Sequence, residues 1–91
     1  MDKFNFDKKL DSLDFGSYSV WVDKIRYIFS KQKSLEGKVI KVYAKEAGGN
    51  DFISFNYYRT STKDILKPCE MPRQKVIDFV INLKLEKPKN E

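Results

Sequence analysis

The sequence contains no histidine and only one cysteine, Cys69, among its 91 residues. Without histidine, neither a Ser-His-Asp nor a Cys-His catalytic arrangement can form. Zinc sites built from cysteine and histidine are excluded for the same reason. One cysteine cannot form an intramolecular disulfide, which is typical of a reducing compartment. We therefore expect a non-catalytic, cytoplasmic protein that needs no cofactor and no metal.

Long apolar runs are absent as well. Residues 1–14 alternate Lys, Asp and apolar side chains, unlike a signal peptide, and no later stretch approaches the ~20 apolar residues of a membrane-spanning helix. The hydrophobic share of 41% is nevertheless too high for a disordered chain. We expect a single folded domain over residues 16–86, flanked by residues 1–15 and a charged tail at 87–91, with no membrane partner.

Positive charge is concentrated in the middle of the chain. The net charge is +5, and Lys24–Lys45 contains seven basic residues against one acidic residue, Glu36. A basic stretch of this kind is typical of proteins that bind a phosphate backbone. A Lys-rich surface that only keeps the protein soluble is the alternative interpretation.

The N-terminal half contains one clear pattern and one ambiguous pattern. Phe6, Leu10 and Leu13 recur at helical spacing, which predicts a short docking helix or a partly ordered arm over 1–15. Residues 17–32 fit either one amphipathic helix or two strands, 17–22 and 25–31, joined by a turn at Asp23-Lys24. The many β-branched and aromatic residues favour the strands.

The next elements are clearer. Residues 38–45 and 52–59 alternate like strands, and the Gly-rich stretch 47–50 between them predicts a hairpin. The polar stretch 60–71 is expected to hold at most a single helical turn, at Ser61–Asp64. Pro72 precedes a helical pattern over 73–84. The predicted fold is α+β: a four-stranded antiparallel β-meander followed by one C-terminal helix that covers one face.

The predicted hairpin interleaves cations with rings on its outward face. Rings stack on bases and cations contact phosphates, so this pairing favours single-stranded nucleic acid. An ordinary cross-strand packing of Tyr43 with Tyr58 is the alternative. Lys31-Gln32-Lys33 has two interpretations: it contacts phosphates or base edges of a nucleic acid, or it is only a polar turn. The outward residues are Lys41, Tyr43, Lys45, Asn56 and Tyr58.

Five short motifs follow one another within residues 18–50: Asp23–Tyr27, Lys31-Gln32, Gly37-Lys38, Ile40–Val42 and Ala47–Asn50. In their order and spacing they resemble a PUR repeat, the single-stranded DNA- and RNA-binding unit of the PUR-alpha family. The resemblance implies a ββββα fold of the PUR and Whirly type, nucleic-acid contacts by Lys31 and Lys38, and a homodimer, because PUR repeats work in pairs. Lys33 and Val39 replace a family amide and a family aromatic residue, so binding should depend more on charge.

The sequence thus predicts a protein that binds single-stranded DNA or RNA, in replication, transcription regulation or RNA handling. A small protein-binding module, such as a phage- or plasmid-type inhibitor of a host enzyme, is the alternative. If residues 17–33 formed a helix, a protein that binds double-stranded nucleic acid would be a third alternative. The predicted nucleic-acid-binding residues are Tyr27, Lys31, Lys33, Lys38, Lys41, Tyr43, Lys45, Asn56 and Tyr58.

Overall fold

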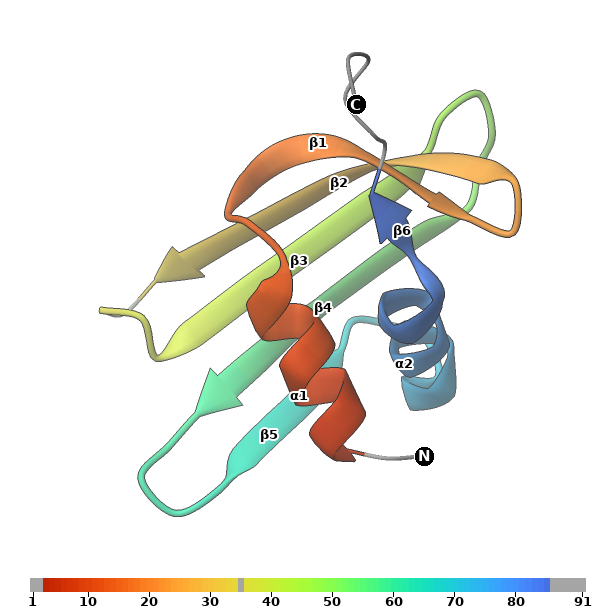
Figure 1. The fold of residues 1–91 in the computed structure, drawn as a ribbon. Coiled ribbons are helices and arrows are strands. Elements are labelled where there is room, and N and C mark those ends of the chain that lie inside the picture. Colours follow the sequence, from red (N-terminus) through yellow and green to blue (C-terminus); the bar gives the residue numbers. More distant parts are fainter. Residues whose placement is uncertain (1–2, 35, 86–91) are drawn as a thin grey trace.

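The computed structural model describes residues 3–34 and 36–85 and shows two helices with one antiparallel sheet of six strands (Figure 1). The α+β class predicted from the sequence is confirmed, but there are more elements than predicted. The charged tail predicted at 87–91 lies outside the described residues. The elements are α1 (Lys3–Ser12), β1 (Gly16–Val22), β2 (Ile25–Ser34), β3 (Val39–Glu46), β4 (Phe52–Arg59), β5 (Asp64–Pro68), α2 (Arg73–Asn82) and β6 (Lys84–Leu85).

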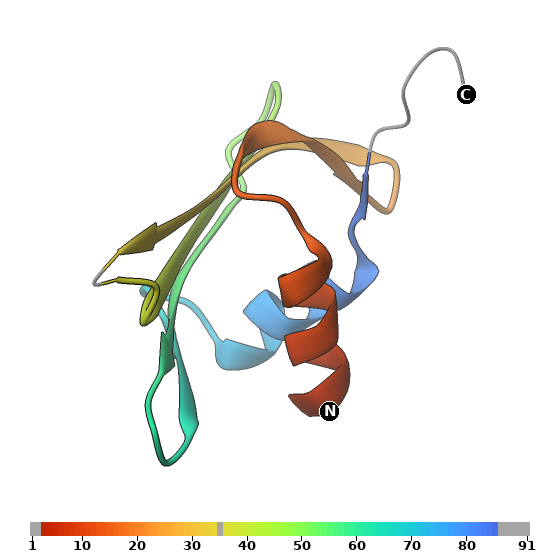
Figure 2. The ribbon, with the colours of Figure 1, turned by 60° about the vertical axis from the view of Figure 1, so that its left-hand side comes forward.

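The sheet is curved, and both helices lie inside the curve (Figure 2). Its strands follow the order β5-β4-β3-β2-β1-β6. Because successive side chains of a strand point to opposite faces, every strand gives one set of residues to the helices and another to the opposite side. We call these sides the inner face and the outer face. Within the described residues, neither helix is long and apolar enough to cross a membrane.

Helix α1 packs on the inner face through the residues that predicted it. Phe6 and Leu10 are buried on the helix, and Leu13 is buried just after its end. The Phe6 ring lies 6.0 Å from that of Phe55 and 5.6 Å from that of Tyr57, both on β4. Of the two alternatives for residues 1–15, the docking helix is therefore the one that forms.

Residues 17–32 form strands, not a helix. Asp23 and Lys24 both have positive φ, 52° and 70°, as in the two-residue turns whose twist matches that of a hairpin. Val22 pairs with Ile25 across this turn. The predicted turn is confirmed, and the single helix considered for this segment is wrong.

The hairpin of β3 and β4 is also confirmed. Val42 pairs with Phe55 and both are buried, while Lys41 pairs with Asn56 on the other face. Gly48, in the turn, has a φ of 80°, a conformation that glycine adopts without a steric penalty.

The segment after β4 forms a fifth strand, where we predicted a single helical turn at Ser61–Asp64. The Thr60 hydroxyl accepts hydrogen bonds from the backbone N–H groups of Thr62 and Lys63, at 3.3 and 2.9 Å, and so closes a tight turn. Asp64 then pairs with Arg59 as β5 begins. This edge strand is only five residues long and ends at a proline, so it gives a weak local signal.

Helix α2 ends earlier than the predicted 73–84, because Leu83 is extended. Trp21 pairs with Lys84, which starts the short edge strand β6. The helix covers the half of the inner face that α1 leaves open, and the Phe79 ring meets the Tyr27 ring edge-on at 4.9 Å. Lys9 of α1 joins the two helices, because its ammonium donates hydrogen bonds to the carbonyls of Ile81, in the last turn of α2, and Leu83, just after it.

The packing of α1 on the sheet predicts that Leu10→Ala lowers the free energy of unfolding by about 3 kcal/mol, since Leu10 is fully buried. Asn5→Ala, at an exposed position of the same helix, should change it by no more than about 0.5 kcal/mol. Urea unfolding followed by circular dichroism measures both values. Equal values would show that α1 does not contribute to the core.

Candidate nucleic-acid interface

The outer face carries no carboxylate on any of the strands β1–β5, all of which the structure describes. In the registers of these strands, the acidic residues fall on the inner face or in turns. Four basic side chains point outward instead, so a ligand on this face would meet positive charge without competing carboxylates. They are Arg26, Lys41, Lys45 and Lys67.

Exposed rings lie among these cations. Tyr43 is 46% exposed, and Trp21 and Phe52 are each 38% exposed. The Tyr43 and Phe52 rings stack on each other, with centroids 6.2 Å apart and planes inclined by 29°. Tyr58 lies at the far end of β4, with the Lys67 ammonium 6.0 Å from its ring centroid. The face therefore offers both phosphate contacts and stacking surfaces.

The register across the sheet arranges the outward residues in rows. Ser30, Tyr43 and Ser54 form one row, because Ser30 pairs with Tyr43 and Tyr43 with Ser54. The neighbouring row is entirely polar and crosses four strands. It consists of Gln32, Lys41, Asn56 and Lys67.

The predicted residues on strands β3 and β4 all point to this outer face. Lys41 and Lys45 extend from β3, and the Lys45 ammonium donates a hydrogen bond to the Gly49 carbonyl at 3.0 Å. Lys38 lies in the turn before β3 and shares a hollow with Tyr58, at the rim of the face. The structure thus brings Lys41, Tyr43, Lys45, Asn56 and Tyr58 together on the outer face, and leaves Lys38 in the turn at its rim.

Tyr27 lies on the inner face, not on the predicted interface. It is buried, and its hydroxyl donates a hydrogen bond to Asp51 at 2.7 Å. Burial, helped by this hydrogen bond, raises the pKa of Tyr27. The Lys75 ammonium, 2.7 Å from the same carboxylate, and Tyr27 together hold the pKa of Asp51 below its ordinary value. Tyr27 therefore contributes to folding and is not positioned to stack on a base.

Lys31 also lies on the inner face, where it is only 2% exposed. Its ammonium donates hydrogen bonds of 2.7 Å to the carbonyls of both Leu10 and Leu13, at the end of α1. A cation at this end also meets the negative end of the helix dipole. Burial lowers the pKa of Lys31. The predicted contact with nucleic acid is not compatible with this position.

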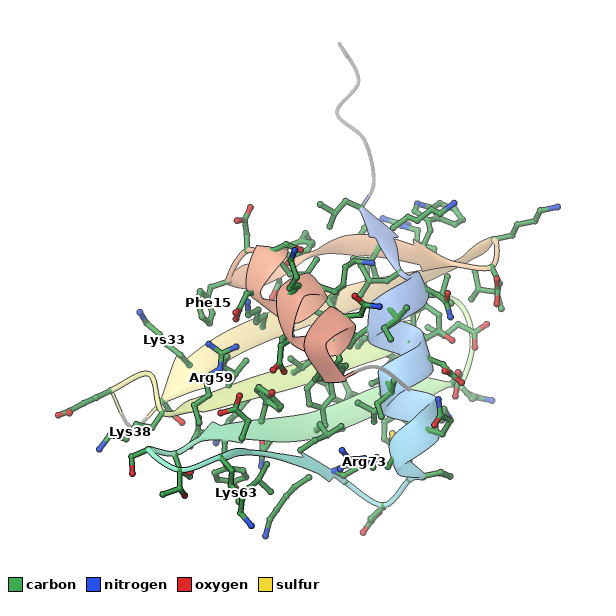
Figure 3. The ribbon with its side chains drawn as sticks, turned by 60° about the horizontal axis from the view of Figure 1, so that its bottom comes forward. Phe15, Lys33, Lys38, Arg59, Lys63 and Arg73 are labelled. Carbon is green, nitrogen blue, oxygen red and sulfur yellow. The ribbon has the colours of Figure 1, made fainter. Side chains whose placement is uncertain are left out.

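Lys33 follows Lys31 by two residues and so has the same inward orientation. Its ammonium lies 5.4 Å from the ring centroid of Phe15, which is half exposed after α1. Figure 3 shows both side chains, together with Arg59, on the side where the helices lie in front of the sheet. Lys33 is therefore separated from the outer-face cations.

Several outer-face residues were missing from the predicted site. Apolar residues alternate onto both faces of β2, so its pattern fits either orientation; the structure turns Tyr27 and Phe29 inward and Ile28 outward. That orientation also places Ser30 and Gln32 outward. Lys67 was missed because β5 was not predicted. Trp21 was not among the predicted residues either, and it is exposed.

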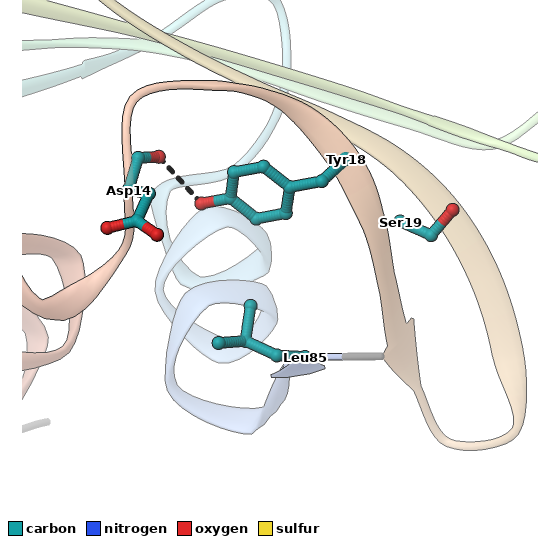
Figure 4. A pocket seen from close by; sticks show the side chains of 4 residues that line it. All are labelled: Asp14, Tyr18, Ser19 and Leu85. Carbon is teal, nitrogen blue, oxygen red and sulfur yellow. Dashed lines mark hydrogen bonds between the residues drawn. The ribbon is translucent and has the colours of Figure 1, made fainter. Parts of the chain in front are cut away.

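A hollow of about 380 Å³ lies at the β1 edge beside β6 (Figure 4). The Tyr18 hydroxyl there donates a hydrogen bond to the Asp14 carbonyl at 2.7 Å. Its lining residues, Asp14, Tyr18, Ser19 and Leu85, include no cation. Residues 3–34 and 36–85 contain no group of three or more metal-ligating side chains. The outer face is therefore the better candidate for an anionic ligand.

Comparisons with protein-family models, curated proteins and solved structures give no match for this chain.

The position of Lys31 predicts that Lys31→Met lowers the free energy of unfolding by about 2 kcal/mol, because the carbonyls at the end of α1 lose a charged donor. Lys41→Met removes the same charge from the outer face and should change stability by less than about 0.5 kcal/mol. Urea unfolding of the two variants compares them. A Lys31→Met protein as stable as Lys41→Met would contradict the capping role.

Proposed function

We propose that this protein binds single-stranded nucleic acid on the outer face of its sheet. The observation that carries the proposal is the composition of that face: four basic side chains, exposed rings and no carboxylate on the outward positions of β1–β5. Lysines and arginines neutralise phosphates, and exposed rings stack on bases regardless of sequence. DNA and RNA both fit this chemistry, in replication, transcription regulation or RNA handling.

A single strand suits this surface better than a duplex. In a duplex the bases are stacked within the helix, so Tyr43 and Phe52 would have no base face to contact. A single strand exposes its base faces to the rings while its phosphates reach Lys41 and Lys45 on the same strand of the sheet. The alternation of ring and cation along β3 thus matches the alternation of base and phosphate.

A homodimer remains a proposal of the same kind. Two copies joined through their outer faces would bring together Arg26, Lys41 and Lys45 of both without carboxylates opposite them, which disfavours association there. Any dimer should therefore leave the nucleic-acid surface accessible.

The protein-binding alternative is supported by one part of the same face. Trp21, Ile28 and Phe52 are each at least 38% exposed, and such residues are frequent anchors of protein interfaces. The dependence of binding on salt concentration distinguishes the two functions. Binding through phosphates weakens steeply as ionic strength rises, whereas binding through apolar anchors does not.

The cations can be tested with Lys41→Met/Lys45→Met and labelled single-stranded oligonucleotides in fluorescence anisotropy. We expect weaker binding to every sequence. The slope of log K against log salt should fall in magnitude by about 1.4, or ~0.7 for each lost phosphate contact. The matched control, Lys33→Met/Lys63→Met, removes the same charge from outside the outer face. Equal losses in the two variants would reject the outer face as the binding surface.

Stacking on Tyr43 predicts a second result. Tyr43→Ala should weaken binding by about 5- to 160-fold, because one base loses its ring partner, while Tyr43→Phe should bind nearly as tightly as the natural protein. The salt slope should stay the same in both variants. If Tyr43→Phe binds as weakly as Tyr43→Ala, the hydroxyl is the essential group and stacking is not the interaction.

A further inference from the structure

A hollow of about 320 Å³ lies on the outer face, over the middle of β2, β3 and β4. Val42 and Phe55, which point inward and are buried, contribute to its floor. Its walls are polar, apart from the ring of one tyrosine, and come from three neighbouring strands. The wall residues are Ser30, Gln32, Lys41, Tyr43, Ser54 and Asn56.

The polar groups of these walls are available to a ligand. Within residues 3–34 and 36–85, the hydroxyls of Ser30 and Ser54 and the amides of Gln32 and Asn56 make no side-chain hydrogen bond. On the inner face, by contrast, the Tyr27 hydroxyl and the Lys31 ammonium each have protein partners. Free donors and acceptors that converge on one hollow are what orients a small polar ligand.

The register sets the spacing of these groups. Tyr43 and Lys41 are two residues apart on β3, about 7 Å along the strand. Ser30 and Ser54 flank Tyr43 on the adjacent strands, each about 5 Å away across the sheet. A stacking ring and a cation therefore stand at the two ends of the hollow, with two hydroxyls beside the ring.

We infer that this hollow holds one nucleotide of an RNA strand and that the protein prefers RNA to DNA. The inference rests on the proposed function. The base stacks on Tyr43 and the phosphate contacts Lys41, so the sugar lies between them, within reach of the serine hydroxyls. The 2′-hydroxyl both donates and accepts hydrogen bonds, as serine does, and it is the group that distinguishes RNA from DNA.

The amides complete this arrangement at the phosphate end. Gln32 and Asn56 lie on either side of Lys41 in the polar row, and their NH₂ groups can donate hydrogen bonds to phosphate or sugar oxygens. Those contacts are the same for RNA and DNA. Discrimination between the two nucleic acids is therefore assigned to Ser30 and Ser54.

The test measures fluorescence anisotropy with a labelled single strand of adenosine and cytidine, made once as RNA and once as DNA, so that the bases are identical. The natural protein should bind the RNA about 2- to 10-fold more tightly, the range for one additional hydrogen bond. Ser30→Ala/Ser54→Ala should bind the DNA as before and bring the RNA-to-DNA ratio to about one. Ser34→Ala, an outward serine of β2 outside the hollow, should keep the ratio.

Each outcome decides a different statement. Equal binding of RNA and DNA by the natural protein would overturn the RNA preference and leave the proposed function intact. A preference for RNA that persists in Ser30→Ala/Ser54→Ala would overturn the assignment to this hollow. Binding of neither strand, even at low salt, would reject the proposed function itself. Circular dichroism of each variant confirms that the fold is retained.

Discussion

The buried ammonium of Lys31 connects the first helix to the sheet, and the rest of the structure depends on that connection. Its two hydrogen bonds end at Leu10 and Leu13, where α1 stops and the chain turns toward β1. A cation placed there satisfies carbonyls that the helix leaves without donors. Because Lys31 points inward, β2 has only one possible orientation, and Gln32 must point outward. Lys31 thus holds the end of α1 against the sheet and determines which residues of β2 point inward.

Lys9 plays a comparable part for the second helix. Its ammonium donates hydrogen bonds to the carbonyls of Ile81 and Leu83, at 3.1 and 2.8 Å. Tyr57 provides a third polar connection, since its hydroxyl donates a hydrogen bond to Asp7 of α1 and lies 3.2 Å from Asp64 of β5. Burial, followed by these carboxylates, raises the pKa of Tyr57. These three polar side chains thus connect both helices to each other and to the sheet.

The residues that stabilise the fold and the residues proposed to bind a ligand lie on opposite faces of the sheet. The residues that hold the helices are buried or paired on the inner face, whereas the outer face has side chains such as Lys41, Tyr43 and Asn56 that are not needed for the core. Substitutions on the outer face can therefore change binding without unfolding the protein. The charge distribution follows the same division, because carboxylates such as Asp11 and Asp51 pair with cations away from the outer face.

The sequence by itself determined the local elements: the helical spacing of α1, the Asp23-Lys24 turn and the alternation of β3 and β4, because each depends on residues close along the chain. Only the tertiary structure decided which face of β2 meets the helices, since a strand with apolar residues on both faces fits either way. The edge strands β5 and β6 were likewise decided by pairing, because both are too short to give a local signal. The orientation of β2 places Lys31 in the core, at the end of α1. From the sequence alone, a lysine at this position could equally be a helix cap or a phosphate contact.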